Sequence, residues 1–185
     1  IDTLVNNAGY GVPGRYLGKD WATHAVSLQV LLIAVCELTH RFLPAMEADA
    51  HGRVLNVASL AGLVPPTGGH TLYGPTKAFV IRFSETLAKE VGPKGVHVCA
   101  LCPGMTYTEF HDVNGMRATV SKLPKGIWLD AASVARLGVD AVEAGKTRIV
   151  TGRANRLIAA LSKYLPDALA GALIASKAKD FRDEG

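Results

Sequence analysis

Three short apolar segments, each running directly into a polar or glycine-bearing turn, constrain the fold of this chain more than any other feature. They begin at residues 1, 54 and 96, and stretches with helical periodicity separate them. Short valine-rich runs are typical of strands buried in a parallel sheet. Their alternation with helices indicates βαβ units. We therefore predict an α/β protein with a three-layer, Rossmann-like, doubly wound parallel sheet.

The detailed layout follows from periodicity and turn residues. Strands are expected at residues 1–5, 53–58, 96–101 and 147–151. Helices are expected at about 20–48, 72–91 and 130–144, with Asp130 as N-cap of the last. The spacing of Phe79, Phe83 and Leu87 predicts a buried helical stripe. The loop 104–128 is long enough to be a substrate lid, and carries Phe110, His111, Met116 and Trp128.

Tyr73 and Lys77 are four residues apart, which on a helix places both side chains on one face. Pro75 is tolerated only in a first turn, so the helix begins close to Tyr73. An adjacent ammonium favours the phenolate, and a shift of roughly 3 units from a pKa of about 10 would let Tyr73 exchange a proton near neutral pH. Ser59 ends a predicted strand, where its hydroxyl could donate to a developing oxyanion.

These residues form part of a larger set of motifs. The trio is accompanied by Asn6-Asn7-Ala8-Gly9 and by Pro103-Gly104-x-x-x-Thr108. In this order and spacing, residues 1 to about 151 resemble the classical short-chain dehydrogenase/reductase family. The resemblance implies an enzyme that interconverts a hydroxyl and a carbonyl on a small, apolar molecule, with NAD or NADP as cofactor.

The resemblance also implies individual roles. Tyr73 would be the general acid/base, Lys77 would lower its pKa and bind the nicotinamide ribose, and Ser59 would hold the substrate oxygen. On the adenosine side, the cofactor would lie against Asn7, Ala8 and Gly9, while Asn6 would steady the sheet. On the nicotinamide side, the contacts would come from Pro103, Gly104, Thr106 and Thr108.

The N-terminus departs from the family pattern. The chain resembles the family only from its fourth strand onward, so we expect an N-terminally truncated member without the first strands and the phosphate loop. Gly9, Gly11 and Gly14 have G-x-G-x-x-G spacing, but their strand already carries the asparagine motif. We interpret this spacing as coincidence. The fragment alone is then expected to bind dinucleotides weakly and to be inactive, with strand 1–5 at an unpaired edge.

Leu31 stands where the family has an asparagine that supports a proton relay to the lysine. A leucine cannot hold a polar kink or a water, so slower catalysis is expected. The alternative is that Leu31 only continues an apolar helical stripe. A second function therefore stays open, a catalytically silent Rossmann-like binding or scaffold protein. A sugar epimerase/dehydratase of the extended branch shares the tyrosine–lysine spacing but fits the asparagine motif less well.

Composition and charge limit the kinds of partner that this chain can bind. A hydrophobic content of 49% with 19% charged residues indicates a globular chain. The net charge of +4 comes without a Lys/Arg run, which argues against nucleic acid. Cys36, Cys99 and Cys102 offer no second pair for zinc, and the histidines show no metal pattern. Free thiols suit a reducing compartment, so the predicted location is cytoplasmic.

The C-terminal segment differs in character from the rest. We predict a dinucleotide-binding domain over residues 1–152 and an amphipathic helical extension over 153–185. The basic amphipathic stretch 154–178 is compatible with packing on the domain, with pairing in a homo-oligomer, or with peripheral contact to a membrane surface.

Overall fold

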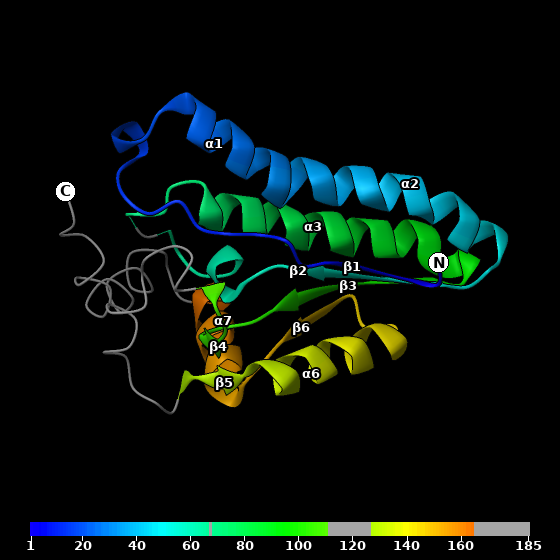
Figure 1. The fold of residues 1–185 in the computed structure, drawn as a ribbon. Helices are drawn as coiled ribbons and strands as arrows, with labels where there is room; N and C mark the ends of the chain where they lie inside the picture. Colours follow the sequence, from blue (N-terminus) through cyan, green and yellow to red (C-terminus); the bar gives the residue numbers. More distant parts are fainter. Residues whose placement is uncertain (67, 111–126, 165–185) are drawn as a thin grey trace.

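A central parallel sheet lies between two layers of helices in the computed structural model, which describes residues 1–66, 68–110 and 127–164. The sheet order is β1-β2-β3-β6, all parallel. The bounds are β1 Thr3–Asn6, β2 Gly52–Val57, β3 Val96–Cys102 and β6 Arg148–Val150. One face is covered by α1 (Trp21–Leu28), α2 (Ala34–Ala48) and α3 (Tyr73–Val91), and the other by α6 (Ala131–Glu143) (Figure 1).

Several smaller elements lie around this sheet. A second, two-stranded parallel pair joins β4 (Thr106–Tyr107) to β5 (Leu129–Asp130). Helix α7 (Arg153–Tyr164) follows β6, and short 3-10 turns lie at Tyr16–Gly18, Leu60–Gly62 and Gly92–Lys94. The predicted strands and helices are thus found with shifts of one or two residues. Asp130 caps α6 as expected, since its carboxylate accepts the Ser133 N–H at 2.9 Å.

The strands bury both of their faces. Val54 and Val98 pack on Met46 of α2, while Leu55 and Cys99, one residue further along each strand, pack on Val134 of α6. Successive strand residues point to opposite faces, so a run of apolar residues is needed when both faces are covered. The three-layer α/β prediction is confirmed.

The helix predicted at residues 20–48 is present but contains one wider turn. Residues Gln29–Ile33 form a π turn between α1 and α2, where the Ala34 N–H donates to the Gln29 carbonyl, five residues back. Leu31 lies in this turn and is only 1% exposed. Leu31 thus continues the apolar side of the helix through a wider turn, and slower catalysis from the missing amide stays a prediction.

A buried chain of polar side chains crosses the first helical layer and the sheet. The Asn6 amide donates to Thr39 Oγ1 at 3.2 Å and to Asn56 Oδ1 at 2.8 Å. The Asn56 amide donates to Ser84 Oγ at 2.9 Å, and that hydroxyl donates to the Val80 carbonyl at 2.8 Å. The chain links α2, β1, β2 and α3. Since unsatisfied buried amides are costly, it fixes how these four elements lie against each other.

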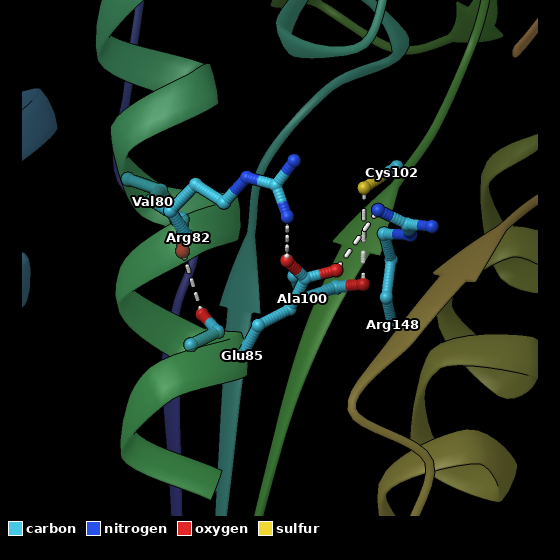
Figure 2. A network of polar contacts seen from close by, with 7 residues as sticks. Val80, Arg82, Glu85, Ala100, Cys102 and Arg148 are labelled. Carbon is cyan, nitrogen blue, oxygen red and sulfur yellow. Dashed lines mark hydrogen bonds and ion pairs between the residues drawn. The ribbon is translucent and has the colours of Figure 1, made fainter. Parts of the chain in front are cut away.

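An ion-pair network links α3 to the far strand of the sheet (Figure 2). Glu85 of α3 accepts from Arg82 on its own helix and from Arg148 of β6, each at 2.8 Å. On the other face, Arg53 of β2 pairs with Glu143 of α6 at 2.8 Å. These pairs are partly exposed, so each contributes at most about 1 kcal/mol. They orient the layers more than they stabilise them.

The stripe predicted from Phe79, Phe83 and Leu87 is only partly buried, since Leu87 packs against the core and Phe83 is half-buried, whereas Phe79 is exposed. Phe79 is 41% exposed, and its ring stacks on that of Phe83 with centroids 6.0 Å apart. The buried face instead carries Val80 and Ile81. Residues on any face of a helix repeat every three or four positions, so the spacing alone cannot show which face is buried. The buried face of α3 also carries polar side chains, which an apolar pattern does not reveal.

We expect Asn56→Val to lower the free energy of unfolding by about 2–4 kcal/mol, because it removes two buried hydrogen bonds, the one that Asn56 accepts from the Asn6 amide and the one that it donates to Ser84 Oγ. Urea unfolding monitored by circular dichroism would measure the loss. Glu37→Ala, which breaks an exposed ion pair with Arg41, is the control and should cost less than about 1 kcal/mol. Equal losses in the two variants would contradict the importance of the amide chain.

Candidate active site

The ends of three neighbouring parallel strands place the predicted site segments along one edge of the sheet. Asn7–Gly9 follows β1, Ser59 follows β2, and the turn Pro103-Gly104 follows β3. Backbone bonds continue beyond the strands, since the Ala58 N–H donates to the Leu101 carbonyl at 2.7 Å and the Leu60 N–H donates to the Pro103 carbonyl at 2.8 Å. This is the edge where open α/β sheets bind their ligands.

Ser59 is held against α3 by the short turn that follows it. Its Oγ accepts the Ala61 N–H at 3.1 Å. A Cβ on Gly62 would lie 2.6 Å from the Ala78 nitrogen and 2.7 Å from the Lys77 carbonyl carbon, so only glycine lets this turn touch the helix backbone. The close approach brings the Ser59 hydroxyl near enough to the phenol of Tyr73 to lower its pKa.

Tyr73 is the first residue of α3, as the proline had indicated. Its N–H donates to the His70 carbonyl at 3.1 Å. One turn later, Lys77 is only 6% exposed and its Nζ donates to the Val57 carbonyl at 2.8 Å. The same Nζ lies 5.7 Å from the centroid of the Tyr73 ring. The helix therefore brings together Ser59, Tyr73 and Lys77, the three residues that the sequence had grouped.

The electrostatics of this trio differ from the sequence expectation. Burial raises the pKa of Tyr73 above its ordinary value, and the hydrogen bond from Ser59 offsets only part of that rise. Burial also lowers the pKa of Lys77 to about 8. The expectation that the ammonium lowers the pKa of the phenol does not hold in this structure, because desolvation outweighs it and Lys77 is directed to the Val57 carbonyl.

Leu31 and Lys77 both border Gly9. A Cβ on Gly9 would lie 2.9 Å from Leu31 Cδ2 and 3.8 Å from Lys77 Nζ. Glycine thus leaves open the space that a side chain would fill beside the ammonium. Asn7 and Ala8 are exposed alongside it. A cofactor ribose is compatible with this opening, whereas Leu31 brings methyl groups to a place where an amide would reach the lysine.

The turn after β3 continues into the start of the predicted lid. Thr106 Oγ1 donates to the Gly104 carbonyl at 3.1 Å, and Thr108 Oγ1 accepts the Phe110 N–H at 3.3 Å. The Phe110 ring lies 5.8 Å from that of Tyr73, centroid to centroid. An apolar ring therefore lies beside the phenol. His111 and Met116, also predicted for the lid, fall outside the described residues.

A small pocket on the other side of Tyr73 was not foreseen. It has room for about one water molecule and lies between α1, α3 and the loop after β1, with His24, Ser27 and Leu31 in its wall. His24 is buried, its Nε2–H donates to the Tyr16 carbonyl at 2.8 Å, and the two rings stack. Neither His24 nor the Val57 carbonyl that holds Lys77 carried a sequence signal, since only tertiary packing places them there.

The glycines with G-x-G-x-x-G spacing do not open a helix. A 3-10 turn follows Gly14, and α1 begins only at Trp21, capped by the Asp20 carboxylate on the Thr23 N–H at 2.9 Å. An acidic cap at that helix end is unfavourable for a phosphate. Gly14 has a φ of 104° and donates its N–H to the Gly69 carbonyl at 2.8 Å. The structure therefore supports the interpretation of this spacing as coincidence.

Within residues 1–66, 68–110 and 127–164, no three His, Cys, Asp or Glu side chains lie close enough to hold a metal ion. Cys99 and Cys102 are buried, and burial raises their pKa values to about 11 and about 12. Both thiols therefore stay protonated at neutral pH.

Fold and site together define a Rossmann-like protein in which a serine, a tyrosine and a lysine converge at the carboxyl edge of a parallel sheet. A family model, "short chain dehydrogenase", matches residues 1–117. The chain belongs to this family.

Curated relatives agree with this membership. Serine 3-dehydrogenase of Rhizobium radiobacter is 37% identical over 133 residues, which cover 69% of this chain and 51% of the relative. Ketoacyl reductase HetN of Nostoc sp. is 30% identical over 165 residues, covering 89% and 56%. The chain spans about half the length of these curated relatives.

Solved structures show the same fold. A short-chain dehydrogenase from Sphingobium yanoikuyae, in complex with NADPH, superposes with a TM-score of 0.75 at 24% identity, covering all of this chain and 68% of that one. A 7beta-hydroxysteroid dehydrogenase superposes with a TM-score of 0.77 at 21% identity, covering 94% and 67%. At such identities the likeness establishes the fold alone.

We expect the buried ammonium of Lys77 to make stability rise with pH. Its folded pKa of about 8 lies below the unfolded 10.5, so the unfolded chain binds more protons between these values. Stability should be lowest below pH 8 and recover by up to about 3 kcal/mol towards pH 10.5. Urea unfolding of the wild type and of Lys77→Met across this range would show a difference that changes with pH.

The control for this experiment is Lys89→Met, which removes an exposed charge from the same helix. Its pH profile should run parallel to that of the wild type. Parallel profiles for Lys77→Met as well would contradict the assignment of a depressed pKa to the buried lysine.

Proposed function

We propose that this site serves NAD(P)-dependent interconversion of a hydroxyl and a carbonyl on a small molecule. One observation carries the proposal. Ser59 and Tyr73 lie close enough for the serine hydroxyl to lower the pKa of the phenol, and the buried Lys77 has its Nζ 5.7 Å from the centroid of the Tyr73 ring, at the sheet edge where β1, β2 and β3 end. Two hydroxyl groups and an ammonium so arranged can hold one oxygen atom and move its proton.

Each residue of the trio has a distinct role in this proposal. Ser59 donates a hydrogen bond to the substrate oxygen and orients it towards the phenol. Tyr73 gives its proton to that oxygen in reduction and takes it back in oxidation. The raised pKa keeps the phenol protonated at neutral pH, which suits the acid role. Lys77, fixed by the Val57 carbonyl, supplies positive charge close to the ring when the phenolate forms.

The nicotinamide cofactor would supply the hydride, and the residues present fit such a group. Gly9 leaves space beside the ammonium of Lys77, which would donate to the ribose. Asn7 and Ala8 would line the adenosine side, and Pro103 with Gly104 the nicotinamide side. In further support, one similar structure is described with bound NADPH, and a 3-oxoacyl-[acyl-carrier protein] reductase at 25% identity with bound NAD. Either dinucleotide is therefore proposed.

Thr106 and Thr108 are proposed as further cofactor contacts, through the carboxamide or the phosphates. In the structure, the Thr106 hydroxyl is directed back to the Gly104 carbonyl, and Thr108 is exposed. For the substrate, we propose an apolar group next to the reacting carbon, because the Phe110 ring lies beside the phenol.

Location and assembly form a separate part of the proposal. The helical run Trp21–Ala48 is long and apolar enough to cross a membrane by length and composition, a test that core helices of soluble proteins also pass. In this structure the run packs against α3 and the sheet on one side, and we propose a cytoplasmic enzyme. Helix α7 exposes Leu157 and Leu161, so contact with a second copy is proposed, with a membrane surface as the other outcome.

We expect Tyr73→Phe to slow carbonyl reduction by about 100-fold or more, because the proton donor is lost while the ring remains. Consumption of NADPH, NADH or reduced nicotinamide mononucleotide would be followed for the full-length protein that carries this chain, with a panel of apolar ketones and aldehydes. The mononucleotide separates contacts at the nicotinamide end from those at the adenosine end. Tyr164→Phe, which alters an exposed tyrosine, is the control and should leave the rate unchanged.

Two results would overturn the proposed function. Equal rates for Tyr73→Phe and the wild type would remove Tyr73 from the chemistry. Cofactor binding without turnover of any compound would favour the alternative, a catalytically silent binding or scaffold protein.

We expect Leu31→Asn to raise turnover several-fold, because an amide beside Gly9 would offer a polar partner to Lys77. The same change should lower thermal stability, since it buries an amide in an apolar position. Leu28→Asn, one turn earlier and only half-buried, is the control for a new polar group in this helix. Unchanged turnover in Leu31→Asn would show that the leucine does not limit the reaction.

A further inference from the structure

Asn155, in the first turn of α7, is a buried polar residue that the mechanism above does not use. It is 4% exposed, although its helix carries mostly exposed side chains. Its Nδ2 donates to the Thr151 carbonyl at 2.8 Å. Gly152, with a φ of 84°, turns the chain sharply between β6 and α7. This turn points the Asn155 side chain back towards the sheet edge, not out to solvent.

The Asn155 amide lies directly against Gly104. A Cβ on Gly104 would come within 2.6 Å of both Asn155 Cγ and Oδ1. No other residue type can therefore stand at position 104 while Asn155 keeps its place. The contact joins the turn that follows β3 to the helix that follows β6, two segments about fifty residues apart in the chain.

Backbone hydrogen bonds hold the same turn on its other sides. The Pro103 carbonyl accepts the Leu60 N–H at 2.8 Å, and the Met105 carbonyl accepts the Leu129 N–H at 2.9 Å. The first bond ties the turn to the segment after Ser59, and the second ties it to β5. The Asn155 amide supports the residue between these two carbonyls.

The Thr151 side chain takes no part in this support. Its Oγ1 is buried without a hydrogen-bond partner among the described residues, while its carbonyl anchors Asn155. The anchor is thus a backbone group, whose position depends on the end of β6. The hydroxyl can be removed without loss of a bond, which makes Thr151→Val a matched control.

We propose that Asn155 is a positioning residue. It holds the Pro103-Gly104 turn in the place where this turn would contact the nicotinamide. The inference rests on the proposed function for the assignment of that turn to the cofactor. The mechanical role of the Asn155 amide does not depend on that assignment. Loss of the Asn155 amide should loosen the turn and weaken the two backbone bonds that flank Gly104, whether or not a dinucleotide is bound.

Hydrogen exchange of the purified chain, read by NMR, tests the positioning directly. In Asn155→Leu, which keeps the volume and removes the amide, the Leu60 and Leu129 amides should exchange at least about tenfold faster. The Val98 amide, in the centre of the sheet, should be unchanged, because a general loss of stability would accelerate all three. In Thr151→Val all three rates should match the wild type.

A second variant keeps the test decisive if Asn155→Leu fails to fold. Asn155→Asp keeps the shape but replaces the Nδ2 donor with an oxygen that repels the Thr151 carbonyl, so it should reproduce the faster exchange of Leu60 and Leu129. Unchanged exchange at these two amides in both Asn155 variants would overturn the positioning role. So would equal acceleration at Val98.

Cofactor affinity supplies a distinct readout. Fluorescence titration of the full-length protein that carries this chain with NADPH should give at least about tenfold weaker binding for Asn155→Leu and no change for Thr151→Val. Faster exchange at Leu60 and Leu129 with unaltered NADPH affinity would overturn the link between the turn and the nicotinamide. If the full-length wild type binds neither NADPH nor NADH, the proposed function fails, and the exchange rates alone decide the positioning role.

Discussion

The attachment of α3 to the ends of β1 and β2 is the constraint on which the rest of the structure depends. Within the layers, Asn56 joins Asn6 on one side to Ser84 on the other, so the helix cannot slide along the sheet without breaking buried amide bonds. At the edge, Lys77 is fixed to the Val57 carbonyl. Ordinary apolar packing would allow several helix registers, whereas these polar contacts select the one that brings Tyr73 over the strand ends.

Much of this arrangement could be predicted from the sequence. The valine-rich runs specified a sheet covered on both faces, and the tyrosine–lysine spacing with its proline specified the start of a helix. The same reasoning failed where two faces of one helix share a period, as at Phe79, and where burial opposes charge, as in the pKa of Tyr73. Local spacing contains no information on desolvation, which depends on segments distant in the chain.

The contact between Asn155 and Gly104 also bears on the domain boundary predicted after residue 152. The first turn of α7 packs on the sheet edge, because its buried amide lies against Gly104 in the turn after β3. Sequence composition changes at that point and suggested an appended helix. The boundary predicted from composition marks the point where exposed basic and apolar side chains begin. The contacts with the sheet domain extend at least one helical turn beyond that point.

The π turn at Gln29–Ile33 has a consequence for the long helix that contains it. A wider turn accommodates one extra residue, and each residue added to a helix rotates everything beyond it by about 100°. Leu31 within the turn faces the candidate site, while Thr39, in the helix beyond the turn, faces Asn6. The π turn thus sets the rotation of α2 relative to α1, so that one continuous helix contacts the candidate site near one end and the internal amide chain near the other.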